Sequence, residues 1–223
     1  MAKTEIEISV VVKVLYSVCM LKVLITGFEP FNKARLNPSE QIVLNLGKDD
    51  VPGAQIIAKV LPVGYSESAD ELIKLVEEHK PDAVISFGQA EGRTAITPER
   101  FAVNMDDASI ADNFGSLRTD QIIESGAPLA FQTTLPIKEI VAAIKAEGVA
   151  ASVSLTAGTF VCNHIFYVMQ NKLAATNVIS GFVHVPLMSE QQEDFPGLFT
   201  MPLEQMVLAA RTIVSVLVSH ASD

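Results

Sequence analysis

Along the chain, short apolar runs alternate with longer amphipathic runs. The short runs predict strands and the amphipathic runs predict helices. The predicted strands cover residues 22–26, 55–63, 82–88, 151–157 and 181–187. The predicted helices cover about residues 37–47, 66–80, 137–147, 163–175 and 203–219, the second of them capped by Ser66. Strands that alternate with helices are typical of an open, mostly parallel sheet with helices on both faces, so we expect a three-layer α/β/α fold.

A long polar stretch, residues 89–131, interrupts this alternation and is predicted to be irregular. A loop of this length inside a compact domain is usually functional. Ligands of such sheets bind beyond the C-terminal ends of the strands. The segments that leave predicted strands at that edge are residues 27–31, 88–104, 158–162 and 184–187.

The first 19 residues stand apart from the rest of the chain. Residues 8–21 are strongly apolar, but a lysine interrupts them and they are shorter than the roughly 20 residues of a membrane span. Two glutamates near the start do not fit a signal peptide. Because Met20 directly precedes the first predicted strand, we interpret residues 1–19 as an extension from an upstream start and residues 20–223 as a single α/β domain.

Composition narrows the possible partners. Of the 223 residues, 49% are apolar and 19% charged, which fits a folded domain. The net charge of −10 disfavours binding to nucleic acid or to anionic membranes. The only two cysteines, Cys19 and Cys162, fit reduced thiols in a cytosolic protein. Neither a zinc-ligand spacing nor a phosphate-binding glycine loop with lysine occurs, so we expect no metal and no cofactor.

Cys162 follows an apolar strand and a glycine turn, at the predicted start of a helix. Unpaired backbone N–H groups and the helix dipole favour a thiolate at such a position, and the thiol pKa can fall well below its usual value of about 8.5. A free cysteine is also commonly a small buried apolar residue, and position alone does not separate the two interpretations.

A nucleophilic cysteine needs a base, usually histidine, and a group that orients it. Of the four histidines, His184 lies in an apolar strand, whereas His164 follows Cys162 by two residues and is expected to face away from the thiol. His184 is therefore the candidate base, with a hydrogen-bonded core histidine as the alternative. Spacing does not select the third member. Its candidates in the long loop are Glu91, Glu99, Asp106, Asp107 and Asp112.

Four segments of the chain resemble the motifs of a known family. They are GFEPF at residues 27–31 with NPS at 37–39, GQAEGRTAITPERFAVN at 88–104, SLTAGTFVCN at 154–163 and GFVHVP at 181–186. In these motifs and in their order, the chain resembles pyroglutamyl peptidase type I, also called pyrrolidone-carboxylate peptidase. The resemblance runs from about Leu21 to Pro186 and leaves the N-terminal extension outside.

The resemblance implies a cytoplasmic cysteine exopeptidase that removes N-terminal pyroglutamate from peptides, needs no metal and commonly forms tetramers. It implies a Cys-His-Glu triad that falls on Cys162, His184 and Glu99. We expect the Cys162 backbone N–H and Arg93 to be oxyanion donors. Glu91 stands where the family often has glycine, which adds a charge near the site.

Pyroglutamate is a neutral lactam, so its site has to grip a flat ring and pair the ring N–H and carbonyl oxygen. We predict that Phe28 and Phe31 clamp the ring and that Phe160 closes one side, with core packing as the alternative for each. The resemblance places the Gln89 side chain on the lactam. The predicted substrate-binding residues also include the Ile110 backbone, for the ring N–H, and Val161.

Two other functions stay open at this point. One is a different cysteine hydrolase, such as a glutamine amidase. The other is a non-catalytic α/β domain that binds a small ligand, with Cys162 merely buried.

Overall fold

The computed structural model describes residues 20–32 and 34–221, so the predicted N-terminal extension lies outside the described residues. The strands are β1 Leu21–Phe28, β2 Ala54–Leu61, β3 Ala83–Gln89, β4 Thr97–Val103, β5 Ala130–Gln132, β6 Ser154–Thr156, β7 Ile179–Val185, β8 Leu187–Met188 and β9 Thr200–Met201. The helices are α2 Pro38–Leu46, α3 Tyr65–His79, α4 Ile137–Ala146, α5 Val161–Leu173, the short 3₁₀ helix η1 Ser189–Gln191 and α6 Leu203–His220.

The main sheet has seven strands in the order β2-β1-β3-β7-β4-β5, with β6 paired to β4. β1 runs parallel to β2 and β3, and β3 runs parallel to β7. β4 is antiparallel to both β7 and β5 and parallel to β6. The prediction of a mostly parallel α/β sheet is confirmed, with β4 and β5 as the antiparallel part.

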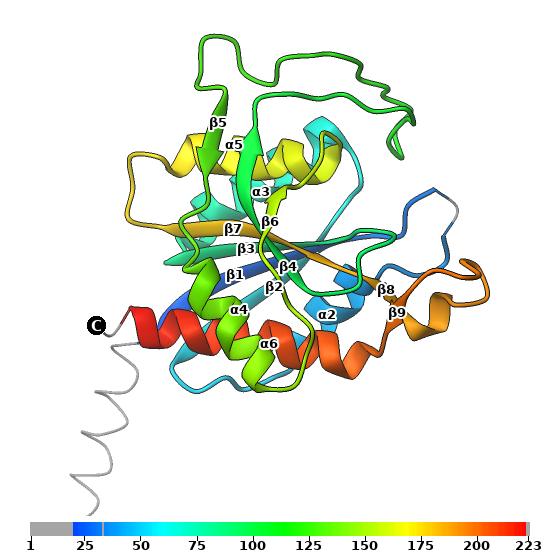
Figure 1. The fold of residues 1–223 in the computed structure, drawn as a ribbon. Coiled ribbons are helices and arrows are strands. Elements are labelled where there is room, and N and C mark those ends of the chain that lie inside the picture. The colour runs from blue at the N-terminus through cyan, green and yellow to red at the C-terminus, as the bar shows by residue number, and fades with distance from the viewer. Residues whose placement is uncertain (1–19, 33, 222–223) are drawn as a thin grey trace, which may run out of the picture.

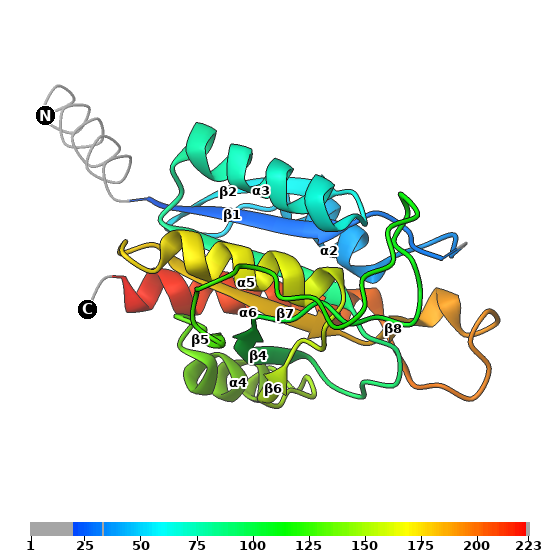
Figure 2. The ribbon, with the colours of Figure 1, turned by 90° about the horizontal axis from the view of Figure 1, so that it is seen from above.

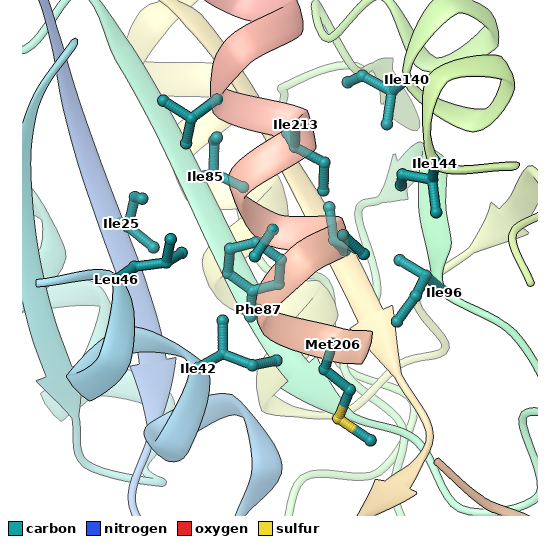
Figure 3. Close-up of a cluster of buried hydrophobic side chains, with 14 of the residues drawn as sticks. Ile25, Ile42, Leu46, Ile85, Phe87, Ile96, Ile140, Ile144, Met206 and Ile213 are labelled. Carbon is teal, nitrogen blue, oxygen red and sulfur yellow. The ribbon is translucent and has the colours of Figure 1, made fainter. Parts of the chain in front are cut away.

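Helices cover both faces of this sheet, as Figures 1 and 2 show: α3 and α5 lie on one face and α2, α4 and α6 on the other. Successive side chains of a strand point to opposite faces. In β1, Val23 and Ile25 therefore join the core under α2, α4 and α6, whereas Leu24 joins the core under α3 and α5. Figure 3 shows the first of these cores, in which Ile42 of α2 and Ile213 of α6 pack with Ile85 of β3.

The prediction that residues 89–131 are irregular throughout is wrong for β4 and β5. β4 has the sequence Thr-Pro-Glu-Arg-Phe-Ala-Val, in which a proline and two charged residues hide the alternation of a strand. Yet Glu99 is completely buried there, and Ala102 belongs to the core. A buried carboxylate inside a strand has no signal in a hydrophobicity pattern.

Two other boundaries differ from the predictions. Helix α3 begins at Tyr65 with Gly64 as N-cap, so Ser66 lies inside the first turn and is not the cap. The predicted strand 151–157 is reduced to β6 and a single bridge between Ile96 and Ala151. Among the described residues, no helix has the length and apolar character that crossing a membrane requires.

Candidate active site

Cys162 is the second residue of helix α5, as its sequence position predicts. The N-cap Phe160 has an extended backbone and supplies no side-chain hydrogen bond. The first backbone bond of the helix runs from the His164 N–H to the Phe160 carbonyl oxygen, at 3.0 Å. The Cys162 N–H precedes that bond and is therefore one of the donors at the helix start that are open to an oxygen in the site.

Because Gly88 has no side chain, the Cys162 thiol packs directly against the backbone of the sheet. A Cβ atom at Gly88 would lie only 3.0 Å from Cys162 Sγ and 2.7 Å from the Phe182 ring. Gly88 of β3 is paired in register with His184 of β7. The His184 ring lies 4.9 Å from the Phe182 ring, centre to centre, on this same side of the sheet. The thiol therefore lies over the strand position adjacent to His184, and a side chain at residue 88 would displace it.

A buried carboxylate orients the His184 ring. His184 Nδ1 lies 2.8 Å from Glu99 Oε1, and the two residues are 5% and 0% exposed. With Nδ1–H donated to Glu99, Nε2 is the ring nitrogen left to accept a proton. Arg93 Nη2 also lies 3.3 Å from Glu99 Oε1 and 3.5 Å from the Thr156 carbonyl oxygen. The contact of Arg93 in this structure is thus with the carboxylate.

The Cys162 thiol is strongly held in its neutral form. Burial and, to a smaller extent, the negative charge of Glu99 raise the pKa of Cys162, the residue's own backbone N–H lowers it, and the combined effect is a pKa of about 12. The expectation that the helix start lowers this pKa is wrong here, because burial outweighs the backbone N–H. The carboxylate that acts on the sulfur is Glu99 and not Glu91. A thiolate therefore needs a nearby base to take the proton.

A cavity of about 590 Å³ opens beside the thiol, to which Cys162 is partly exposed. Five of the six predicted substrate-binding residues line it together with Cys162: Phe28, Phe31, Gln89, Phe160 and Val161. The rings of Phe31 and Phe160 are 5.2 Å apart, centre to centre. Ile110 is 46% exposed and is not among the lining residues, and neither are His184 and Arg93.

A model of the family "Pyroglutamyl peptidase" matches residues 21–220. The chain belongs to the pyroglutamyl peptidase family. It is 45% identical over 204 residues to a pyrrolidone-carboxylate peptidase of Aliivibrio fischeri, covering 92% of this chain and 96% of that protein. A pyrrolidone-carboxylate peptidase of Bacillus licheniformis is 43% identical over 204 residues, with 91% and 94% covered.

Solved pyroglutamyl peptidases share the fold. The crystal structure of Bacillus amyloliquefaciens pyroglutamyl peptidase I has a TM-score of 0.85 and 39% identity, and the match covers 89% of this chain and 97% of that one. Pyrrolidone carboxyl peptidase from the hyperthermophile Pyrococcus furiosus has a TM-score of 0.86 and 38% identity, with 89% and 99% covered. The expected resemblance and α/β architecture are confirmed.

The site also contains residues that sequence reasoning missed. Arg35, Asp194 and Phe195 line the cavity, and Arg35 forms an exposed ion pair with Asp194 at 3.4 Å. Residues 189–200 form a mostly polar stretch before the last helix, and its hydrophobicity pattern does not indicate a contact with the site. The available signal was the presence of two aromatic residues within that polar stretch, Phe195 and Phe199, of which Phe195 lines the cavity.

Proposed function

We propose that this member of the pyroglutamyl peptidase family hydrolyses the bond after an N-terminal pyroglutamate, with Cys162 as nucleophile, His184 as base and Glu99 as the group that orients His184. One observation carries the proposal: Cys162 Sγ packs over Gly88, whose strand partner His184 is bound to the buried Glu99, at the wall of an open cavity. A merely buried thiol would need neither this neighbour nor the cavity.

The reaction takes two steps. His184 Nε2 accepts the thiol proton as Cys162 Sγ attacks the carbonyl carbon that links pyroglutamate to the next residue. The tetrahedral intermediate collapses when the imidazolium protonates the leaving amine, which breaks the C–N bond and leaves a thioester. His184 then accepts a proton from water, hydroxide adds to the thioester, and the proton returns to the sulfur as free pyroglutamic acid leaves.

The transfer of the Cys162 proton to His184 is coupled to the attack of the sulfur on the substrate, because the thiol does not ionise on its own at neutral pH. With a pKa of about 12, the isolated thiol gives almost no thiolate at neutral pH. Once His184 carries the proton, its positive charge lies next to the sulfur, and Glu99 stabilises that imidazolium. We propose the Cys162 N–H as one oxyanion donor and Arg93 as the second, since the Glu99 contact uses only part of its guanidinium.

The cavity walls suit a small flat lactam. Phe28, Phe31 and Phe160 supply apolar faces, and Gln89 supplies an amide at the same wall as the thiol. We propose that these residues and Val161 hold the ring. The pairing of the ring N–H with the Ile110 backbone stays a prediction, because Ile110 lies outside the cavity wall.

Hydrolysis of chromogenic amides tests the function. We expect release of the chromophore from a pyroglutamyl amide, at least about 10⁴-fold slower release from the prolyl amide, and loss of activity in Cys162→Ser. A site built to pair the lactam carbonyl leaves a polar group unpaired when proline binds. Equal cleavage of both amides, or full activity of Cys162→Ser, would contradict the proposal.

We also propose that the enzyme is a cytoplasmic homo-oligomer, most simply a tetramer. Large apolar side chains are exposed along and around the long loop: Phe101, Ile110, Phe114, Leu117, Ile122, Leu129 and Leu155. Burying such side chains between subunits is favourable. Light scattering of the purified protein measures the assembly, and a monomer at micromolar concentration would contradict it.

A further inference from the structure

Gln191 ends the short helix η1 and lies behind the cavity wall. It is 1% exposed and is not among the cavity-lining residues, yet its side chain touches one of them, Gln89. Gln89 is the last residue of β3, one position after the glycine on which the thiol rests. Gln191 is a buried polar residue in direct contact with the proposed ring-binding amide. It can therefore determine whether that amide presents a donor or an acceptor to the cavity.

The hydrogen bonds of Gln191 leave its amide one orientation. Its Oε1 accepts the Met188 backbone N–H at 3.0 Å, and its Nε2 donates to the Leu36 carbonyl oxygen at 3.3 Å. A backbone N–H only donates and a carbonyl oxygen only accepts, so reversing the Gln191 amide would lose both bonds. Its Nε2 is therefore the group that faces Gln89, and it donates to Gln89 Oε1 at 2.9 Å.

This bond in turn orients Gln89. With its oxygen bound to Gln191, Gln89 is left with its Nε2 donor for other partners, and the hydrogen bonds of the described residues include none for that nitrogen. Gln89 lines the cavity together with Cys162. The cavity wall at Gln89 is therefore a hydrogen-bond donor, although a free glutamine amide can present either a donor or an acceptor.

We propose that Gln191 is a positioning residue that makes Gln89 a donor to the ring carbonyl oxygen of pyroglutamate, and so contributes to the choice of lactam over proline. The inference rests on the proposed function. It assigns Gln191 no contact with the substrate. The Met188 N–H fixes the orientation of the Gln191 amide, the Gln191 amide fixes that of Gln89, and Gln89 then donates to the ring.

The decisive variant is Gln191→Glu, which keeps an acceptor for the Met188 N–H and turns the donor into a second acceptor. Gln89 then reverses its amide to donate to the carboxylate, and its oxygen faces the ring oxygen. We expect KM for a pyroglutamyl amide, and Ki for the unreactive lactam 2-pyrrolidinone, to rise together by about 10-fold or more, the size of one oriented hydrogen bond, with kcat changed less than about 3-fold.

Gln191→Met keeps the size of the side chain without a charge, so it tests the idea even if the glutamate variant does not fold. We expect it to raise KM and Ki about 3- to 10-fold, because Gln89 becomes free to rotate. In a Gln89→Met background, Gln191→Met should add no further rise in KM or Ki, since Gln191 acts only through Gln89.

Two results would overturn the inference: unchanged KM and Ki in Gln191→Met, or a double variant in which the two losses multiply. Alkylation of Cys162 by iodoacetamide in the absence of ligand should proceed at the wild-type rate in Gln191→Met, because this substitution adds no charge near the thiol; a much slower rate would mean that the variant disturbs the nucleophile and not only Gln89. An inactive wild-type enzyme contradicts the proposed function itself. An active wild type with an indifferent Gln191 contradicts only the positioning role.

Discussion

The structure contains two buried histidine–carboxylate pairs that are alike in most of their contacts. His184 Nδ1 lies 2.8 Å from Glu99 Oε1, and His164 Nδ1 lies 2.8 Å from Asp106 Oδ2. An arginine contacts the same carboxylate oxygen in each pair, Arg93 at 3.3 Å and Arg118 at 2.8 Å. The other oxygen of each carboxylate is buried without a hydrogen-bond partner among the described residues.

The pairs differ in what surrounds them. Glu99 and His184 lie on adjacent strands next to Gly88, and the charge of Glu99 raises the pKa of the thiol. The other pair faces a tyrosine: the His164 ring stacks edge-on against Tyr65 at 5.5 Å, and burial, followed by the charge of Asp106, raises the Tyr65 pKa. An Arg–carboxylate–His group is therefore no sign of catalysis by itself. The group that it acts on decides its role, here the proposed nucleophile Cys162 in one case and Tyr65 in the other.

Replacing each histidine in turn should give the largest difference in kcat between the two pairs. We expect His184→Asn to lower kcat by about 10⁴-fold or more, because no group is left to accept the thiol proton. His164→Asn should leave kcat of the folded enzyme within about 3-fold and lower the melting temperature. Steady-state kinetics and thermal melts of both variants measure the contrast. If His164→Asn abolishes turnover without unfolding the protein, the assignment of the two histidines is wrong.

The carboxylates should separate in the same way with smaller effects. Glu99→Gln removes the charge that stabilises the imidazolium, so we expect kcat to fall about 10²- to 10⁴-fold with the melting temperature nearly unchanged. Asp106→Asn weakens the ties to His164 and Arg118 and should cost about 1–3 kcal/mol of unfolding free energy, while kcat holds. Denaturant unfolding beside kinetics tests both, and a stable but inactive Asp106→Asn would speak against the contrast.

The charge of Glu99 should also be visible in the thiol itself. In a His184→Asn background, the pH at which iodoacetamide begins to alkylate Cys162 follows the thiol pKa. Burial and Glu99 both disfavour the thiolate, so alkylation should rise only well above pH 9, toward the pKa of about 12. Adding Glu99→Gln removes one of these causes and should move the profile to lower pH. Adding Asp106→Asn should leave it in place, and an equal shift from both would contradict the contrast.

The hydrophobicity pattern is sufficient for the layers of the fold but not for the position of Glu99. Val23, Leu24 and Ile25 alternate between the two cores, as the period of a strand demands. β4 escapes the same reasoning because Pro98 and Glu99 break its alternation. Glu99 came from the family resemblance, since spacing alone left five acidic residues as equal candidates.

Contacts between distant segments that no motif joins lie beyond sequence reasoning. Gln191 lies 102 residues from Gln89 along the chain, and no motif joins them. The thiol pKa is a similar case: a helix start predicts a lowered value, but how deeply the sulfur is buried depends on its packing against Gly88. The sequence identifies the participants, whereas their electrostatics and orientation follow from how β3, β7 and α5 pack.

The smallest expected effect concerns Tyr65, the residue on which the non-catalytic pair acts. Its hydroxyl is buried without a partner among the described residues, and burial, followed by Asp106, raises its pKa to about 12. A pKa raised above the unfolded value contributes stability that is present below about pH 10 and is lost as the pH rises toward 12. Tyr65→Phe keeps the ring and removes this ionisation. We expect unchanged or up to about 1 kcal/mol higher stability at pH 7.

Tyr167→Phe is the matched control, because the Tyr167 hydroxyl donates to the Pro128 carbonyl oxygen at 2.7 Å. That variant should lose about 1 kcal/mol at pH 7, the usual contribution of one hydrogen bond. Unfolding free energies from pH 7 to 11 measure both, and the advantage of Tyr65→Phe over wild type should widen above pH 10. Both variants should keep kcat within about 2-fold. A large loss of kcat in Tyr65→Phe alone would mean that the His164 pair serves the reaction after all, because its tyrosine neighbour would then be coupled to the nucleophile.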